Sequence, residues 1–211
     1  MNKKIHAVIF DLDGTLTEPV LDFDLIRSEI GQISGPILEA MDKMAASQRQ
    51  RAEEILRKHE RLAVEQSRLN PGVHEVMDWL RQHDKRIGLF TRNQRESVET
   101  FCRMHHLVFD GIVTREDGPY KPDPFPVACA CQQMRVRAEA AVVVGDYVFD
   151  LMSGRRAGAR TVLLGTHKSY QKFTDHADFV ILNLAELPGV IENLENSQFC
   201  QSRVRIADKG S

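Results

Sequence analysis

Two aspartates at the end of an apolar segment are the residues best suited to chemistry in this chain. The run 7–10 (AVIF) has the character of a buried parallel strand, and Asp11 and Asp13 follow it, just before a glycine. In open α/β sheets, ligands bind at the carboxyl ends of such strands. Two carboxylates this close usually need a cation, and Mg²⁺ prefers oxygen ligands from carboxylates, water and phosphate. An ordinary aspartate turn fits the motif equally well, so the other strand ends decide.

A second group of strand ends carries side chains that suit phosphate. The segment 86–90 reads as a strand, and Thr91, Arg92 and Asn93 follow it with a hydroxyl, a guanidinium and an amide. Backbone N–H groups at the start of the next helix would add to this anion site. Further on, flanking prolines restrict the backbone around Lys121, whose ammonium can serve as a phosphate counter-ion. The simpler alternatives are a helix cap at Thr91 and a solvated charge at Lys121.

Another acidic pair follows a third apolar strand. The run 141–144 leads through Gly145 to Asp146, and Asp150 comes four residues later. These carboxylates can complete the metal site, although Asp150 could also simply favour a helix amino terminus. Acid pair, threonine, lysine and acid pair each follow apolar strands in this order, which makes coincidence improbable. The sequence therefore predicts one site that binds both a metal and a phosphate.

This order of motifs resembles that of the haloacid dehalogenase-like (HAD) hydrolases. The four family motifs match the run 11–15 (DLDGT), Thr91, Lys121, and Gly145-Asp146 with Asp150. The resemblance implies an α/β fold, with a Rossmann-like, mostly parallel sheet flanked by helices. It also implies a small all-helical cap inserted after the first strand, as in the phosphoglycolate phosphatase-like subgroup.

The resemblance also implies an activity, namely Mg²⁺-dependent hydrolysis of a small phosphate monoester. Asp11 would be the nucleophile that forms an aspartyl-phosphate, and Asp13 would be the acid and base. The implied phosphate ligands are Thr91 and Lys121, next to Arg92 and Asn93. The implied magnesium ligands are Asp11, the backbone carbonyl of Asp13, and Asp146. Asp150 would be either a further metal ligand or a group that orients the metal-bound waters.

Two other functions use similar residues. A phosphomutase of the same superfamily would share all four motifs and return the phosphoryl group to a sugar. A receiver-like phospho-switch also combines acids, a threonine and a lysine around Mg²⁺. Such a switch resembles a chain of about half this length, with its phosphoacceptor on an inner strand, so the order of motifs favours an enzyme.

The elements predicted around the motifs suggest a core domain at 1–17 and 71–196. The segment 18–70 reads as the helical cap, with a helix over 36–45 and a longer one, capped by Ser47, from Gln48 to about Arg68. The polar segment 197–211 is predicted to be disordered.

Composition limits the partners. The chain has 211 residues, 42% of them hydrophobic, which allows one full core and a modest insertion. A net charge of −2 argues against nucleic acid as the main partner. The sequence has no run of eighteen apolar residues and no evident signal segment, so we expect a cytoplasmic protein without a membrane partner. The expected partner is a small phosphorylated metabolite, and the sequence leaves monomer and homodimer open.

Overall fold

A six-stranded parallel sheet forms the centre of the protein. The computed structural model describes residues 4–196, and its strands are β1 (Ala7–Phe10), β2 (Arg86–Phe90), β3 (Gly111–Val113), β4 (Ala141–Gly145), β5 (Arg160–Leu164) and β6 (Phe179–Ile181). Their order in the sheet is β3-β2-β1-β4-β5-β6, and every neighbouring pair is parallel. The predicted α/β fold class is thus confirmed, and β1 lies between β2, which Thr91 follows, and β4, which Asp146 follows.

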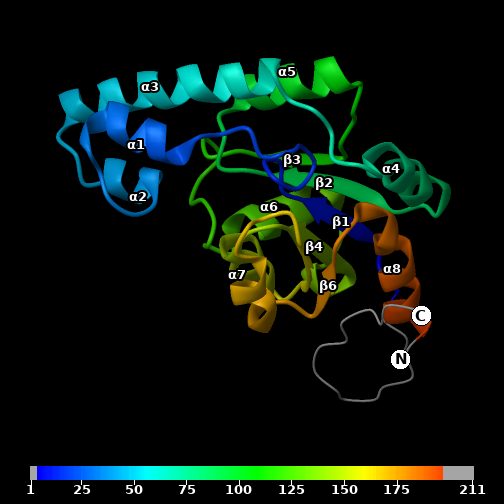
Figure 1. Cartoon of the computed structure of the whole chain (residues 1–211). Coiled ribbons are helices and arrows are strands. Elements are labelled where there is room, and N and C mark those ends of the chain that lie inside the picture. The colour runs from blue at the N-terminus through cyan, green and yellow to red at the C-terminus, as the bar shows by residue number, and fades with distance from the viewer. Residues whose placement is uncertain (1–3, 197–211) are drawn as a thin grey trace.

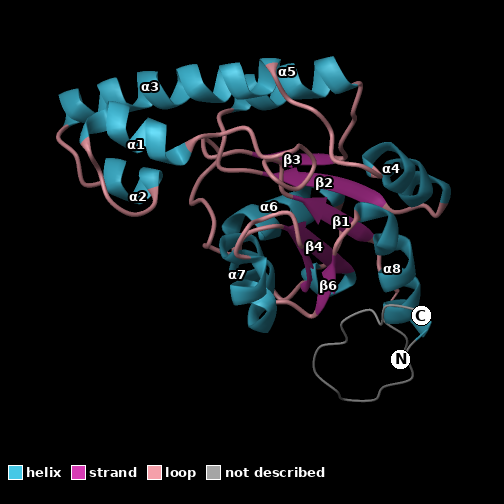
Figure 2. Cartoon of the chain, in the orientation of Figure 1, coloured by secondary structure: helices cyan, strands magenta, loops and turns pink. Residues whose placement is uncertain are grey.

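Helices cover both faces of this sheet (Figure 2). Val8 and Phe10 of β1 point into a core shared with α4 (Val73–Gln82), α5 (Arg95–His105) and α8 (Leu187–Asn196). The alternate residues Ala7 and Ile9 face α6 (Phe125–Met134). Helix α7 (Val148–Ala157) packs beside α6. Because both faces are covered, β1 is apolar throughout, as expected for a buried parallel strand.

The segment predicted to be a cap is helical and lies to one side of the sheet (Figure 1). It consists of α1 (Phe23–Gly31), α2 (Ile37–Met41) and α3 (Ala46–Glu65). These helices share a small core of their own, formed by residues such as Ile26, Leu38, Met41, Ala52 and Leu56.

Two details of the predicted cap helices are wrong. Helix α2 ends at Met41 rather than at residue 45, because the chain turns back there through hydrogen bonds from Lys43 N to Ala40 O and from Met44 N to Met41 O. Ser47 does not cap the next helix. The cap position is Ala45, which makes no side-chain cap hydrogen bond, and Ser47 lies within the first turn of α3.

The two connections between sheet and cap run next to each other. Thr17 and Leu69 form an isolated antiparallel bridge. Glu18 N donates to Arg68 O at 2.9 Å, as Asn70 N does to Leu16 O. The chain therefore enters and leaves the cap through one narrow, hydrogen-bonded pair of segments.

The predicted disordered tail at 197–211 lies outside the described residues. Within 4–196, no helix is long and apolar enough to cross a membrane.

Candidate active site

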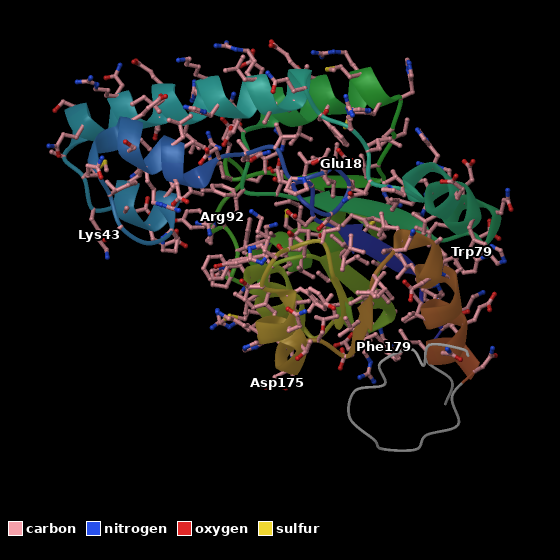
Figure 3. All side chains as sticks on the ribbon, viewed as in Figure 1. Glu18, Lys43, Trp79, Arg92, Asp175 and Phe179 are labelled. Atoms are coloured by element: carbon pink, nitrogen blue, oxygen red, sulfur yellow. The ribbon has the colours of Figure 1, made fainter. Side chains whose placement is uncertain are left out.

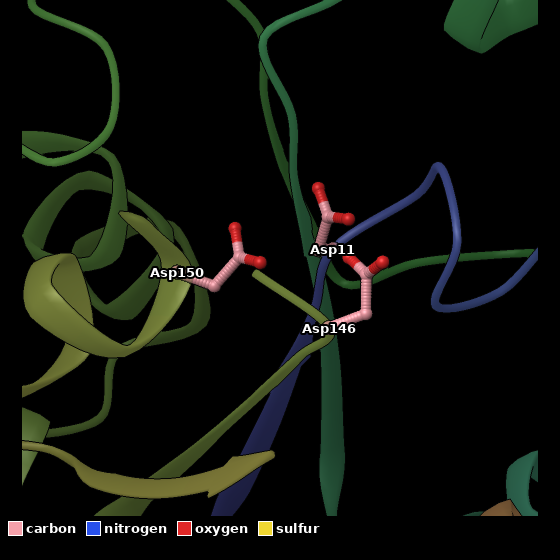
Figure 4. A group of neighbouring side chains, drawn as sticks. All are labelled: Asp11, Asp146 and Asp150. Atoms are coloured by element: carbon pink, nitrogen blue, oxygen red, sulfur yellow. The ribbon is translucent and has the colours of Figure 1, made fainter. Parts of the chain in front are cut away.

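Three buried carboxylates meet at the carboxyl edge of the sheet (Figure 4). Asp11 follows β1, Asp146 follows β4, and Asp150 lies in the first turn of α7. One oxygen from each lies within 4.8 Å of the others. The backbone N–H of Asp11 donates to Val144 O at 2.9 Å, so the pairing of β1 with β4 fixes where this aspartate leaves the sheet.

Glycines allow these carboxylates to approach so closely. Gly14 has a φ of +82°, and a Cβ at this position would lie 2.4 Å from Oδ2 of Asp146. A Cβ on Gly145 would likewise lie 2.4 Å from Oδ2 of Asp150. Any side chain at either position would collide with a carboxylate, so both glycines are needed for the shape of the site.

Lys121 joins two of the acids. Its buried ammonium contacts the carboxylate of Asp11 and lies 2.7 Å from Oδ1 of Asp150. The other oxygen of Asp150 accepts a hydrogen bond from Tyr147 N at 3.0 Å. Burial lowers the pKa of Lys121, but the two carboxylates outweigh burial and raise it overall. The lysine is therefore charged at neutral pH, and both oxygens of Asp150 already have donors.

The residues after β2 complete this side of the cavity. Asn93 donates through Nδ2 to Oδ2 of Asp13 at 2.7 Å, and its backbone N–H donates to the hydroxyl oxygen of Thr91 at 3.1 Å. Burial raises the pKa of Asp13, although the hydrogen bond from Asn93 opposes this. Thr91, Asn93, Lys121 and the four aspartates all line one cavity. The structure thus brings together the residues that the sequence singled out.

Arg92 lines the same cavity but its guanidinium is engaged with the cap. It lies at the junction of cap and core (Figure 3) and forms an ion pair with Glu39 of α2 at 2.6 Å. The guanidinium carbon also lies 4.7 Å from the ring centre of Tyr120 and 5.2 Å from that of Phe149. Its role in binding phosphate stays a prediction.

Negative charge exceeds positive charge at the bottom of this cavity. Burial raises the pKa of Asp11 to about 7, with Lys121 acting in the opposite direction. Burial and the nearby Asp11 raise the pKa of Asp146 well above its usual range. Within residues 4–196, the carboxylate of Asp146 forms neither a hydrogen bond nor an ion pair. A cluster of buried oxygen donors with excess negative charge is a suitable environment for a hard divalent cation.

Two polar residues near the site were missed by the sequence reasoning. Asn70 is 8% exposed, and its side-chain amide donates to the carbonyl oxygens of Gly14, Thr15 and Thr17 at 3.2, 2.8 and 3.0 Å. It therefore fastens the aspartate turn to the return connection of the cap. The only signal in the sequence was an Asn-Pro pair, which indicates a loop and not a buried partner.

Glu60 of α3 is the second residue that was missed. It is 2% exposed, and its carboxylate accepts from the guanidinium of Arg115 and from Gln94 N, the latter at 3.3 Å. Burial raises the pKa of Glu60 to about 7, against the opposing effect of Arg115. This buried ion pair holds the cap helix to the core. In the sequence, Glu60 looked like any other charge on a solvated helix.

Comparison with known proteins supports the family resemblance. Residues 20–164 match the family model described as haloacid dehalogenase-like hydrolase. A hydrolase of Saccharomyces cerevisiae is 33% identical over 202 residues, which cover 92% of this chain and 93% of the relative. The pyrophosphatase PpaX of Bacillus velezensis is 28% identical over 214 residues, which cover 88% of this chain and 96% of the relative.

Solved structures share the fold. A hydrolase from Pseudomonas syringae superposes with a TM-score of 0.78 at 21% identity, over 89% of this chain and 98% of the other. A predicted phosphoglycolate phosphatase from Haemophilus somnus gives 0.69 at 19% identity, over 90% and 99%. Together with the family model and the yeast relative, the motifs on their shared sheet edge lead to one assignment: the chain belongs to the haloacid dehalogenase-like hydrolase family.

Proposed function

We propose that this protein is a phosphatase that hydrolyses a phosphate monoester through an aspartyl-phosphate on Asp11. The observation that carries the proposal is the meeting of Asp11 and Asp13 with Lys121 and Thr91 in one cavity. Family membership supports a hydrolase and disfavours a receiver-like switch.

In the first step, an oxygen of the Asp11 carboxylate attacks phosphorus as the bond from phosphorus to the ester oxygen breaks. Asp13 gives its proton to the departing alkoxide, so the alcohol leaves neutral. Burial favours the protonated form of Asp13, which suits it as an acid. Lys121, together with the hydroxyl of Thr91, holds the phosphoryl oxygens, since this reaction depends mainly on positioning and charge stabilisation.

In the second step, Asp13 takes a proton from water, and the water oxygen attacks the phosphorus of the aspartyl-phosphate. The bond from phosphorus to Asp11 breaks, which restores the carboxylate and releases inorganic phosphate. Asp13 ends protonated, as it began. Splitting one difficult displacement into two in this way is the advantage of a covalent intermediate.

A magnesium ion fits the donors of this site. We infer that Asp11, Asp146 and the backbone carbonyl of Asp13 would hold it, because the carboxylate of Asp146 is buried without a partner among residues 4–196. Asp150 would act through Lys121, because both of its oxygens accept hydrogen bonds. Bound Mg²⁺ would supply positive charge that keeps Asp11 ionised and neutralises the phosphoryl oxygens.

Acid-quench mass spectrometry tests this function. The wild type, mixed with Mg²⁺ and a panel of phosphate esters, should release phosphate and show one phosphoryl group on the peptide that contains Asp11. Pyrophosphate, a phosphoric anhydride, is tested beside the esters, because the PpaX relative is named a pyrophosphatase. A phosphoryl group that persists on Asp11 and requires a sugar bisphosphate would instead indicate a phosphomutase. Folded protein that binds Mg²⁺ but turns over no ester would refute the proposal.

A further inference from the structure

The cavity above the carboxylates continues into the cap, where its wall is mainly carbon. Its volume is about 620 Å³, within the range of about 300–1,000 Å³ that is typical of small-molecule sites. The cap contributes six apolar residues to the wall: Leu21, Phe23, Pro36, Ile37, Leu38 and Leu56. A phosphoryl group with a two-carbon acid would fill only the end of the cavity near Asp11.

The charged side chains at this end of the cavity already have partners within the chain. These pairs are Arg27 with Asp24, Arg92 with Glu39, and Glu60 with Arg115. A charged leaving group would have to compete with the existing partner for one of these side chains, because, in the part of the chain that the structure describes, no charged group of the cap wall lacks a partner. A neutral leaving group would leave all three intact.

Phe23 stands at the open side of this wall. The residue is 49% exposed although it is one of the largest apolar residues of the cap, so the protein leaves much of it uncovered. Leu25, two residues along the same helix, is 47% exposed but does not line the cavity. An apolar ligand in the cavity would remove the exposed surface of Phe23 from water, which is favourable.

We propose that the leaving group of the substrate is an uncharged, mainly apolar alcohol of more than two carbons, which packs against Phe23 and the apolar cap wall. This inference rests on the proposed phosphatase function and deepens it by naming the class of substrate. The phosphoryl group occupies the acidic end of the cavity near Lys121, and the carbon chain extends towards α1 and α2.

A series of straight-chain alkyl phosphates from ethyl to hexyl tests the size and polarity of the leaving group. The alcohols have similar acidity, so differences in rate report contacts and not leaving-group chemistry. We expect kcat/KM to rise roughly fourfold for each methylene that the wall covers. Hexyl phosphate should exceed both 2-phosphoglycolate and pyrophosphate. Equal kcat/KM values along the series would overturn the inference. A preference for 2-phosphoglycolate or pyrophosphate would also overturn it, particularly if the Arg27→Gln variant lost that preference.

Two matched variants locate the contact. Phe23→Ser should lower kcat/KM for hexyl phosphate by about tenfold, on the order of half the burial of such a side chain, and leave ethyl phosphate unchanged. Leu25→Ser removes a similarly exposed side chain from the same helix and should change neither substrate. Equal effects of the two variants, or an equal loss with ethyl and hexyl phosphate, would show that the wall does not contact the leaving group.

A binding measurement separates the two proposals. Calorimetry with hexylphosphonate and ethylphosphonate, at saturating Mg²⁺, reports the apolar contact without any hydrolysis. Tighter binding of the hexyl compound by a protein that hydrolyses no ester would refute the phosphatase function but support the apolar site. Hydrolysis of ethyl phosphate with equal binding of both phosphonates would retain the phosphatase and refute the apolar site.

Discussion

The two ends of the cavity differ in how their charges are held. At the sheet edge, four aspartates line the cavity, but the Lys121 ammonium pairs with Asp11 and Asp150 only, and the carboxylate of Asp146 is buried without a partner among residues 4–196. At the cap, each charged side chain of the wall is paired and the remaining surface is apolar. Excess charge is useful where charge moves during a reaction. This difference supports our two proposals, which place the chemistry at the sheet edge and the choice of substrate at the cap.

Removal of the nucleophile at the sheet edge should have the largest effect. Asp11→Asn should lower kcat by about 10⁴-fold or more, because an amide cannot form the aspartyl-phosphate. The melting temperature should not fall, because the amide keeps the shape of the side chain and carries no buried charge. Phosphate release and thermal unfolding, measured on the same preparation, check both effects. Retained turnover in this variant would remove Asp11 from the mechanism.

Asp13→Asn tests the second carboxyl group at the same end of the cavity. The asparagine carbonyl can still accept from Asn93, but the side chain can no longer transfer a proton. We expect kcat for an alkyl phosphate to fall by about 10²–10⁴-fold, the usual range for general acid–base catalysis. Burst kinetics should show which step has slowed. A loss of less than tenfold, with the binding of ethylphosphonate unchanged, would mean that Asp13 is not the acid.

The sheet edge was predictable from sequence because each of its residues follows a local pattern. An apolar run ending in aspartate, threonine or glycine marks the carboxyl end of a strand. Parallel pairing of β1 with β2 and β4 then brings those ends together. The local signals and the tertiary arrangement agree, so residues such as Asp11, Thr91 and Asp146 could be named in advance.

The cap end was much less predictable, because its features arise from packing between distant segments. Glu60 and Arg115 are 55 positions apart, and nothing local marks either as a buried partner. Leu56 lies on the apolar face of α3, but nothing in its sequence position shows that it also lines a cavity. Serine is a residue type that favours helix caps. The turn that joins α2 and α3 nevertheless places Ala45, and not Ser47, at the cap position of α3. An amphipathic pattern shows which face of a helix is buried, but it does not show which other segment covers that face.

The Glu60–Arg115 pair allows a test through pH. Because folding raises the pKa of Glu60 from 4.5 to about 7, the folded state binds more protons than the unfolded state between these pH values. The free energy of unfolding should therefore fall as pH rises from about 4.5 to 7, with Glu60 contributing at most about 3 kcal/mol. Glu60→Gln should remove the Glu60 share of this dependence and leave the share of the site aspartates, whose pKa values burial also raises. Urea unfolding at pH 5 and pH 8 measures it.

Glu54→Gln is the matched control for that experiment. Glu54 is exposed on the same helix, so its substitution should leave the pH dependence as in the wild type. An identical dependence in the wild type and in Glu60→Gln would show that the Glu60 carboxylate is fully compensated by Arg115. The cap would then be held by an ion pair in which Arg115 fully offsets the buried charge of Glu60. The contrast between paired charges at the cap and excess negative charge at the sheet edge would become larger.

The smallest effect is expected at the Arg92–Glu39 pair, which is partly open to solvent. Glu39→Gln keeps the size of the side chain and removes its charge, so stability should change by less than about 1 kcal/mol, as for other accessible ion pairs. The ring contacts of Arg92 with Tyr120 and Phe149 would still hold the guanidinium in place. If Arg92 serves the cap wall, kcat/KM for ethyl phosphate should stay within about threefold of the wild type, since 1.4 kcal/mol is needed for a tenfold change. If Arg92 instead binds phosphate once it is released from Glu39, the variant should bind ethylphosphonate more tightly than the wild type does. Arg92 would then act with Lys121 and Thr91 at the sheet edge, and not as part of the cap wall.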